Sequence, residues 1–187
     1  MATTADVKNG LVVEMDGQLF TVVEFQHVKP GKGGAFVRIK LKNVITGKVI
    51  DRTLRSGEKV DIVRIEERQM QFLYREENGF VFMDQETFDQ VNVSGVVLGD
   101  DARFLKEGEL VTVSFHIEKP IRATLPFFIN FKIVECEPGA RGDTVSNVTK
   151  SAKLETGAVV QVPLFVEQGE TIRVDTRTGQ YLERVRG

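Results

Sequence analysis

The chain has 187 residues, 41% of them hydrophobic and 28% charged, a balance that is typical of a globular domain rather than a disordered segment. No apolar run approaches the roughly 20 residues that span a bilayer, and the start "MATTADVKNG" lacks the parts of a secretory signal. One cysteine, Cys136, and two histidines cannot build a disulfide or a metal cluster of the usual spacing, so we expect a cytoplasmic protein without membrane, metal or cofactor.

Apolar and polar residues alternate with a period of two along most of the chain, which predicts short strands. Turn pairs separate such runs at Asp16-Gly17, Thr46-Gly47 and Asn78-Gly79. The runs LVTVSFHI, INFKIVEC, AVVQVPLFV and ETIRVDT are also strand-like, and in DTRTG, residues 175–179, we expect Asp175 and Thr176 to bond the local backbone of a turn. Only QETFDQV (85–91) and DARFLKEG (101–108) are compatible with short helices. The sequence therefore predicts an all-β protein of small barrels.

Two breaks divide the chain into three pieces of about 60 residues. The sign of the local charge changes near residue 64, and Pro126 interrupts the alternation in TLPFF, residues 124–128. Pieces of this size are near the lower limit for an independent core, so each should be a compact barrel. We predict domains at 1–64, 65–127 and 128–187.

The net charge of −2 conceals a strong asymmetry. Residues 26–55 carry eight Lys or Arg against the single acid Asp51, a local charge of +7, whereas residues 65–127 carry twelve acids and six bases. Local fields rather than net charge attract polyanions, although charged strand faces also arise simply because they are solvated. Charge alone leaves contact with nucleic acid and mere solvation as equal alternatives.

The basic segment contains the run FVRIKLKNV, in which apolar and basic residues alternate and therefore point to opposite faces of a predicted strand. Val37, Ile39 and Leu41 would face a core. Arg38, Lys40 and Lys42 would form a row of cations on the other face. Such a row would suit the phosphate backbone of a nucleic acid.

A glycine-rich stretch, HVKPGKGGAF at 27–36, lies between the apolar runs FTVVEFQHV and AFVRIKLKN and predicts the tip of a hairpin. Proline presets φ at the second turn position and glycine accepts a positive φ at the third, which predicts a turn at Pro30-Gly31. A phosphate-binding P-loop is a poor fit because Lys32 is followed by Gly33 and then by a strand pattern. Two readings remain: a tight turn with a solvated lysine, or a bare tip that carries one amine into a narrow cleft.

Specific motifs then point to a family. KPGKGGAF (29–36) resembles the signature loop of bacterial translation elongation factor P, and KLETGAVVQVPLFVEQGETIRVDTRTGQYLERV (153–185) is similar to its C-terminal block. FVFMD (80–84) and PGARGDT (138–144) fit two further motifs of that family in the same order. The resemblance extends over the whole chain, and a third piece at 128–187 favours the bacterial factor over its two-domain archaeal and eukaryotic relatives.

The resemblance implies a fold and a role. The fold would be three β-barrels, an SH3-like (KOW-type) barrel followed by two OB-type barrels, in an L-shape that mimics transfer RNA. The protein would be a monomeric factor without enzymatic activity. It would bind the ribosome between the peptidyl and exit sites, contacting ribosomal RNA and peptidyl-tRNA, and would relieve stalling at consecutive prolines.

The resemblance also assigns residues. Lys32 matches the lysine that a modifying enzyme extends in many bacteria and that contacts the CCA end of peptidyl-tRNA. The loop residues Pro30, Gly31, Gly33 and Gly34 would permit close approach, and the RNA backbone would be contacted by Lys29, Arg38, Lys40 and Lys42. Contacts with the small subunit and the anticodon stem would come from Gly142, Asp143, Thr144, Tyr181 and Arg184. Asn147, Val148 and Ser151 depart from the family pattern, which leaves the path of the chain after Ser146 open.

Two other classes of function compete with this one. A generic single-stranded RNA-binding OB protein would use aromatic platforms, but the chain has no tryptophan and two tyrosines, and most of its 13 phenylalanines fall in apolar runs that suggest core packing. An enzyme would need a nucleophile and base, and none is evident. The acidic pairs Glu66-Glu67, Glu76-Glu77 and Asp100-Asp101 lie near predicted turns, where we expect solvated faces.

Overall fold

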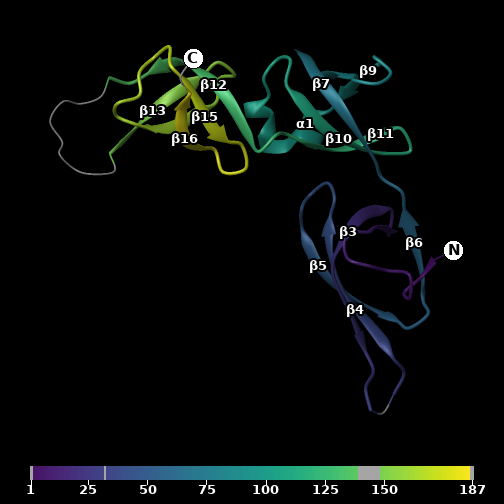
Figure 1. Ribbon diagram of the computed structural model, residues 1–187. Coiled ribbons are helices and arrows are strands. Elements are labelled where there is room, and N and C mark those ends of the chain that lie inside the picture. The colour runs from purple at the N-terminus through teal and green to yellow at the C-terminus, as the bar shows by residue number, and fades with distance from the viewer. Residues whose placement is uncertain (1, 32, 139–147, 186–187) are drawn as a thin grey trace. The chain divides into compact units, whose positions relative to one another are not determined.

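A computed structural model describes residues 2–31, 33–138 and 148–185 (Figure 1). Three antiparallel β-sheets follow one another along the chain, which confirms the predicted all-β character. No helix within the described ranges is long and apolar enough to cross a membrane. By contacts the residues group into two compact units, one with residues up to Arg68 and Val113–Arg122, the other with Gln69–Thr112 and the residues from Ala123 onward. The predicted domain boundaries at 64/65 and 127/128 stay predictions.

The N-terminal sheet has six strands in the order β1-β6-β2-β3-β4-β5. Its strands are β1 (Ala2–Thr3), β2 (Val12–Met15), β3 (Gln18–Val28), β4 (Phe36–Asn43), β5 (Val49–Arg55) and β6 (Lys59–Val63). The pair Asp16-Gly17 joins β2 to β3 with positive φ at both residues, which is the backbone of a type I′ hairpin turn. Apolar side chains, most of them from β2, β3 and β4, make the core, and Val13, Val37 and Leu41 are completely buried.

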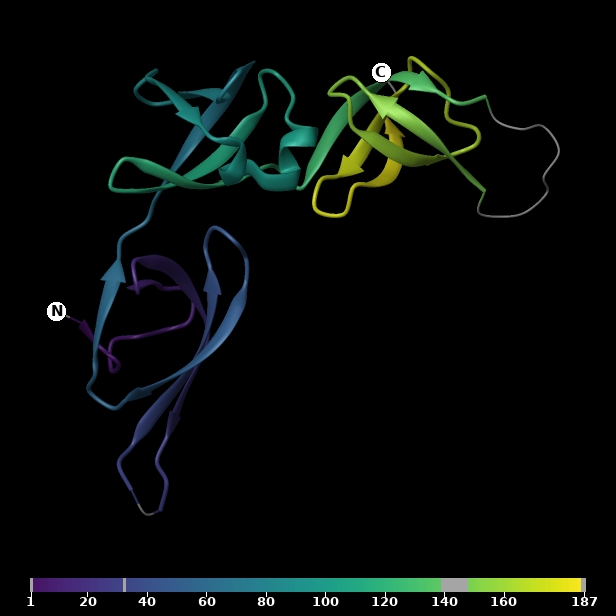
Figure 2. The same cartoon turned by 180° about the vertical axis from the view of Figure 1, so that it is seen from behind.

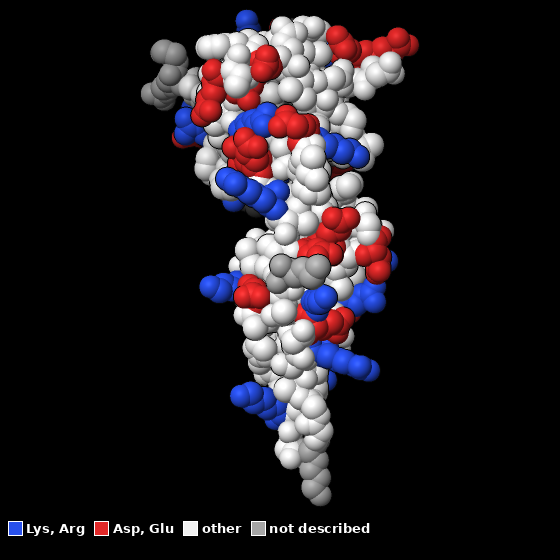
Figure 3. Space-filling model, turned by 90° about the vertical axis from the view of Figure 1, so that its right-hand side faces the viewer, with Lys and Arg blue, Asp and Glu red and all other residues white. Residues whose placement is uncertain are grey.

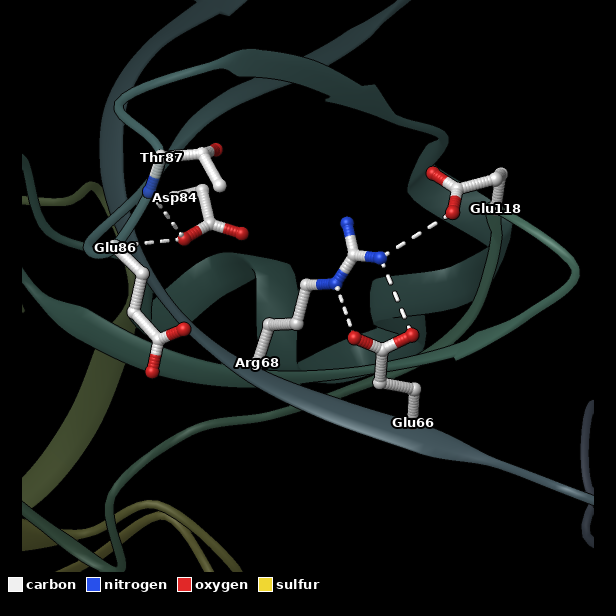
Figure 4. Close-up of polar contacts among 6 residues, drawn as sticks. All are labelled: Glu66, Arg68, Asp84, Glu86, Thr87 and Glu118. Atoms are coloured by element: carbon white, nitrogen blue, oxygen red, sulfur yellow. Dashed lines mark hydrogen bonds and ion pairs between the residues drawn. The ribbon is translucent and has the colours of Figure 1, made fainter.

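The middle sheet has five strands in the order β11-β10-β7-β8-β9. They are β7 (Glu66–Glu76), β8 (Gly79–Asp84), β9 (Gln90–Val93), β10 (Leu110–His116) and β11 (Lys119–Thr124). The helical expectations hold only in part: residues 85–89 are turn and coil before β9, while α1 (Gly95–Leu98) precedes a 3-10 helix, η1 (Gly99–Phe104). Asp84 explains the first failure, because its buried carboxylate accepts hydrogen bonds from the N–H groups of Glu86 and Thr87 at 2.8 and 3.2 Å and stabilises a turn (Figure 4).

The C-terminal sheet has five strands in the order β14-β13-β12-β15-β16. They are β12 (Phe128–Cys136), β13 (Thr149–Leu154), β14 (Val159–Pro163), β15 (Thr171–Asp175) and β16 (Gln180–Val185). Within the second compact unit η1 packs on this sheet, with the rings of Phe104 in η1 and Phe131 in β12 5.9 Å apart. The ammonium group of Lys106 lies 2.9 Å from the Glu155 carboxylate, which fastens the same contact.

The turn between β15 and β16 confirms the predicted local backbone hydrogen bond of Asp175 but not that of Thr176. Asp175, only 7% exposed, accepts hydrogen bonds from the Arg177 guanidinium at 2.6 and 3.0 Å and from the Arg177 N–H at 3.0 Å. Thr176 differs from expectation because its hydroxyl donates to the carbonyl of Pro126, fifty residues away, at 2.7 Å. The turn therefore ties β15 to the segment that leads into β12.

We expect Gly79→Ala to destabilise the fold. Gly79 is buried, and an added Cβ would meet Asn92 Oδ1 and lie 2.9 Å from the carbonyl oxygen of Val93. Overlap with backbone should lower the free energy of unfolding, measured in urea, by about 1–3 kcal/mol. Gly34→Ala is the control, because nothing lies within 4 Å of its added Cβ, and an equal loss in both variants would contradict the steric explanation.

We also expect Asp175 to contribute to acid sensitivity. Hydrogen bonds from the Arg177 side chain hold the pKa of Asp175 below its usual value of 3.8. A lowered carboxyl pKa stabilises the fold above pH 3.8, and this contribution is lost as the pH falls further through the folded-state pKa. Asp175→Asn should thus lower the melting temperature at pH 7, and its deficit against wild type should shrink below pH 3.8.

Glu135→Gln is the matched control for this measurement. Glu135 is an exposed carboxylate of the same sheet, 3.9 Å from Lys153, and exposed pairs of this kind contribute little. A deficit of Asp175→Asn that stayed constant down to pH 2 would contradict the assignment.

Candidate nucleic-acid interface

The hairpin of β3 and β4 is the most prominent feature of the N-terminal sheet. Its two strands pair from Phe20 with Asn43 to Val28 with Phe36, and the hairpin extends beyond the rest of the sheet (Figures 1 and 2). Residues 29–35 connect the strands, so the predicted hairpin is confirmed. Lys32 is the middle residue of this connection in sequence and lies outside the described residues.

The base of the hairpin is held by the core. Val37, Ile39 and Leu41 of β4 are 0–2% exposed, whereas Arg38 and Lys42 are exposed, as the alternation predicted. On β3, opposite Ile39 and Val37, the rings of Phe25 and His27 pack edge to face at 4.9 Å. The hairpin is thus anchored on one face and leaves the other face to solvent.

The described tip residues Lys29, Pro30, Gly31, Gly33 and Gly34 are all exposed. The predicted turn geometry is wrong in one respect: the positive φ of 120° occurs at Gly33, and Gly31 has an ordinary φ. A Cβ at Gly31 or Gly34 would meet nothing within 4 Å, so packing does not require glycine at either position. The tip therefore has fewer side chains than its packing would allow.

The row of cations behind the tip is less uniform than the sequence indicated. Lys40 forms an ion pair with Glu24 at 3.1 Å and is also paired in register with Asp51, and its pKa is raised, first by the hydrogen bond to Glu24. Arg38 and Lys42 have no such pair among the described residues. Figure 3 shows uncharged residues at the narrow end of this part of the molecule and Lys and Arg side chains on its sides.

Glu24 is the residue that sequence reasoning missed, since the charge count began at residue 26. The pairing could have been predicted from the sequence. In a hairpin centred on Lys32, residues equally far before and after Lys32 are opposite each other, so Glu24 is opposite Lys40, as observed. Two free cations, Arg38 and Lys42, therefore replace the expected three.

Two acidic residues of the middle segment, Glu66 and Glu118, form ion pairs with Arg68. Glu66 accepts two hydrogen bonds from the Arg68 guanidinium at 3.1 and 3.2 Å, and Glu118 accepts a third at 3.4 Å (Figure 4). The guanidinium also lies 4.7 Å from the centre of the Phe115 ring. Glu66 is thus paired, and its side chain is still 60% exposed, as expected for a solvated face. The described part of the chain contains no cluster of three or more metal-ligand side chains.

At the C-terminal sheet the structure brings Tyr181 and Arg184 onto one strand face. Residues three apart on a regular strand point to opposite sides, but a register shift opposite Arg173 and Val174 aligns Tyr181 with Val174 and Arg184 with Ile172. Arg184 is not free: it bonds Glu170 at 3.1 Å and lies 5.0 Å from the Phe165 ring centre.

The remaining predicted contacts of this region are only partly visible. Gly142, Asp143 and Thr144 lie outside the described residues. Ser151, where the family has proline, is part of β13, and its hydroxyl accepts a hydrogen bond from Gln161 of β14 at 3.0 Å. The chain is therefore in regular strand pairing again by Thr149.

Three family models match the chain in sequence. The elongation factor P KOW-like domain matches residues 3–60, the elongation factor P OB domain residues 65–123, and the elongation factor P C-terminal model residues 129–184. With the three sheets, these matches confirm the predicted fold class of a KOW-type barrel followed by OB-type barrels.

Full-length relatives agree with this result. Elongation factor P of Chloroflexus aurantiacus is 53% identical over 185 residues, 98% of each chain, and that of Leifsonia xyli subsp. xyli is 52% identical over 99% of each chain. In fold, translation initiation factor 5A from Methanococcus jannaschii matches with a TM-score of 0.52 and 22% identity over 65% of this chain and 94% of that one. The relatives are named as a translation factor and not as an enzyme, as expected, and the chain belongs to the elongation factor P family.

Proposed function

We propose that this translation elongation factor binds the ribosome between the peptidyl and exit sites, beside peptidyl-tRNA, and promotes peptide-bond formation at consecutive prolines. The observation that carries the proposal is the hairpin tip: five exposed residues flank Lys32 in sequence and three of them are glycines. Packing does not demand glycine at two of these three positions, Gly31 and Gly34. A bare tip suits entry into a narrow cleft lined by RNA.

The role of the tip is positioning. Proline is a secondary amine with a locked φ, which makes it an awkward partner in peptide transfer. A factor that holds the CCA end of peptidyl-tRNA in a reactive geometry lowers the entropic part of the barrier without supplying an acid or a base. Lys32 would make this contact through charge-assisted hydrogen bonds, and a lysine-modifying enzyme that extends its amine would lengthen the reach.

The cationic face would hold the RNA backbone. Arg38 and Lys42 are exposed without ion pairs among the described residues, and Lys29 adds a charge at the tip. Lys40 would contribute less because Glu24 already compensates its charge. Phosphate contacts of this kind fix position and make affinity sensitive to salt, but they read no sequence.

At the other end of the chain, Tyr181, Arg184, Gly142, Asp143 and Thr144 would meet the small subunit and the anticodon stem. Arg184 would have to exchange its bond with Glu170 for a phosphate, whereas Tyr181 is half-buried and presents only part of its ring. We propose that the protein acts as a monomer in the cytoplasm, where its partners are found. A generic single-stranded RNA-binding protein remains the alternative, and Phe88, Phe127, Phe128 and Phe165 are exposed enough to serve it.

We expect Lys32→Ala to slow synthesis through a triple-proline stretch in a reconstituted translation system by about tenfold, the loss of one charge-assisted contact of about 1.5 kcal/mol. Lys48→Ala, an exposed lysine in another turn of the same sheet, should leave the rate unchanged. Wild-type speed in the Lys32→Ala variant would refute the proposed role of the tip. Micromolar or tighter binding of unstructured RNA without ribosomes would instead favour the generic RNA-binding alternative.

The pairing of Lys40 predicts an order of effects on ribosome binding. Arg38→Gln and Lys42→Gln should each weaken binding and reduce the slope of log affinity against log salt by about 1, because each removes one phosphate contact. Lys40→Gln should have a smaller effect, and Glu24→Gln should strengthen binding by releasing Lys40. Equal effects of the three cation substitutions would contradict the role given to Glu24.

A further inference from the structure

A cavity of about 520 Å³ lies within the second compact unit, between η1 and the C-terminal sheet. Arg103 and Phe104 of η1 line one side, and Val159 and Gln161 of β14 line another. The remaining lining comes chiefly from the β15–β16 turn and the start of β16, including Gly179 and Tyr181. The volume is in the range of small-molecule sites, and none of the described lining residues is acidic.

The guanidinium of Arg103 is held in place without an ion pair. It lies 4.6 Å from the ring centre of Phe104, a residue that is 1% exposed, so one face of the guanidinium rests on an immobile ring. Arg68, Arg173 and Arg184 each bond a carboxylate, but no described residue forms an ion pair with Arg103. Its charge and its N–H donors are therefore available to an anion.

Gly179 makes this arrangement possible. A Cβ at Gly179 would lie 3.3 Å from the Arg103 guanidinium and 3.4 Å from the Phe104 ring, and the φ of +71° also favours glycine. The turn can thus approach the arginine closely, which places Tyr181, two residues further on, in the lining of the same cavity. Sequence reasoning treated this glycine only as part of a turn.

The other walls suit a planar, partly polar group. Val159 is 58% exposed and offers an apolar surface, and Tyr181 is half-buried. β14 and β16 are the two edge strands of this sheet, so the backbone N–H and C=O groups on their outer sides can form hydrogen bonds with a ligand. Aromatic rings in a positively charged groove are how OB-type barrels hold the bases of single-stranded nucleic acid.

We propose that this cavity binds a nucleotide, with its phosphate at Arg103 and its base at Tyr181. A guanidinium matches the geometry of a phosphate with paired hydrogen bonds, and a tyrosine ring offers a stacking surface to any base. A cationic ligand would be repelled by Arg103, and a purely apolar ligand would leave the guanidinium without a partner. The nucleotide belongs either to single-stranded RNA or to the free pool, and the two sources share this chemistry.

This inference deepens the proposed contact of the C-terminal sheet with RNA. It rests on that proposed function only if the bound nucleotide belongs to RNA. One phosphate contact and one stacked base give only weak binding, with an expected dissociation constant of about 1 mM. Such affinity is too weak for a free-standing RNA-binding protein. It would add to the other contacts once the protein was held on a ribosome.

The test is titration of the full-length protein with uridine 5′-monophosphate, adenosine 5′-monophosphate and single-stranded hexauridylate, followed by the amide resonances of residues 159–162 and 178–181. Arg103→Gln should weaken binding about tenfold, and Tyr181→Leu should do the same, because each removes one of the two contacts. Tyr181→Phe keeps the ring and should bind as wild type does. Arg75→Gln is the matched control: Arg75 also stacks on a phenylalanine, 5.2 Å from the Phe80 ring centre, outside the cavity.

Tighter binding of hexauridylate than of either monophosphate would support the pocket and assign RNA as its source, and equal binding would support it and assign free nucleotides. Absence of saturable shifts with all three probes, or shifts that Arg103→Gln leaves unchanged, would overturn the proposal. Failure of the two proposals can be told apart. The titration involves no ribosome, and Lys32→Ala should not alter it even though that variant slows synthesis at prolines.

Discussion

Antiparallel pairing of β3 with β4 is the constraint on which the candidate interface depends. Seven residues from Lys29 to Ala35 bring almost no apolar side chain to the fold, so they cannot stabilise their own position. Their position is set by the strands that lead to them. Eight residue pairs, from Phe20–Asn43 to Val28–Phe36, join β3 to β4, and Val37, Ile39 and Leu41 are buried in the core. Separating the anchor from the tip in this way allows the tip to be bare, because packing requires no side chain at Gly31 or Gly34.

Ion pairing decides which charges can act on a partner. Lys40 and Arg68 have carboxylate partners, and exposed pairs of this kind stabilise a fold little while they cancel the field that a polyanion would meet. Arg38 and Arg103 lie against phenylalanine rings, 5.6 and 4.6 Å from the ring centres, and neither has an ion pair among the described residues. A ring fixes a guanidinium without neutralising it, so these two side chains keep both position and charge.

The sequence was informative where side-chain alternation was strong. Strands rich in valine, isoleucine and phenylalanine, such as β4, β8 and β10, appear where their patterns indicated. β11 and β13 were missed because Lys119, Pro120, Lys150 and Ser151 hide the period, and Pro120 is tolerated since β11 is an edge strand. Local rules also misplaced the positive φ at Gly31 rather than Gly33. Tyr181 and Arg184 share a face only because of a register shift, and no local pattern announces such a shift.

The proposed nucleotide cavity could not be found from sequence because its two halves, η1 and the C-terminal sheet, are far apart along the chain. Arg103 precedes β10 of the middle sheet, and Tyr181 is on β16, 78 positions later in the printed sequence. Contact between Phe104 and Phe131, with the Lys106–Glu155 ion pair, holds η1 against the C-terminal sheet. Burial raises the pKa of Glu155, but hydrogen bonds from the Lys132 N–H and from Lys106 outweigh it and lower the pKa, so the carboxylate stays charged at neutral pH. Packing of η1 on the C-terminal sheet thus creates a site that neither element contains by itself.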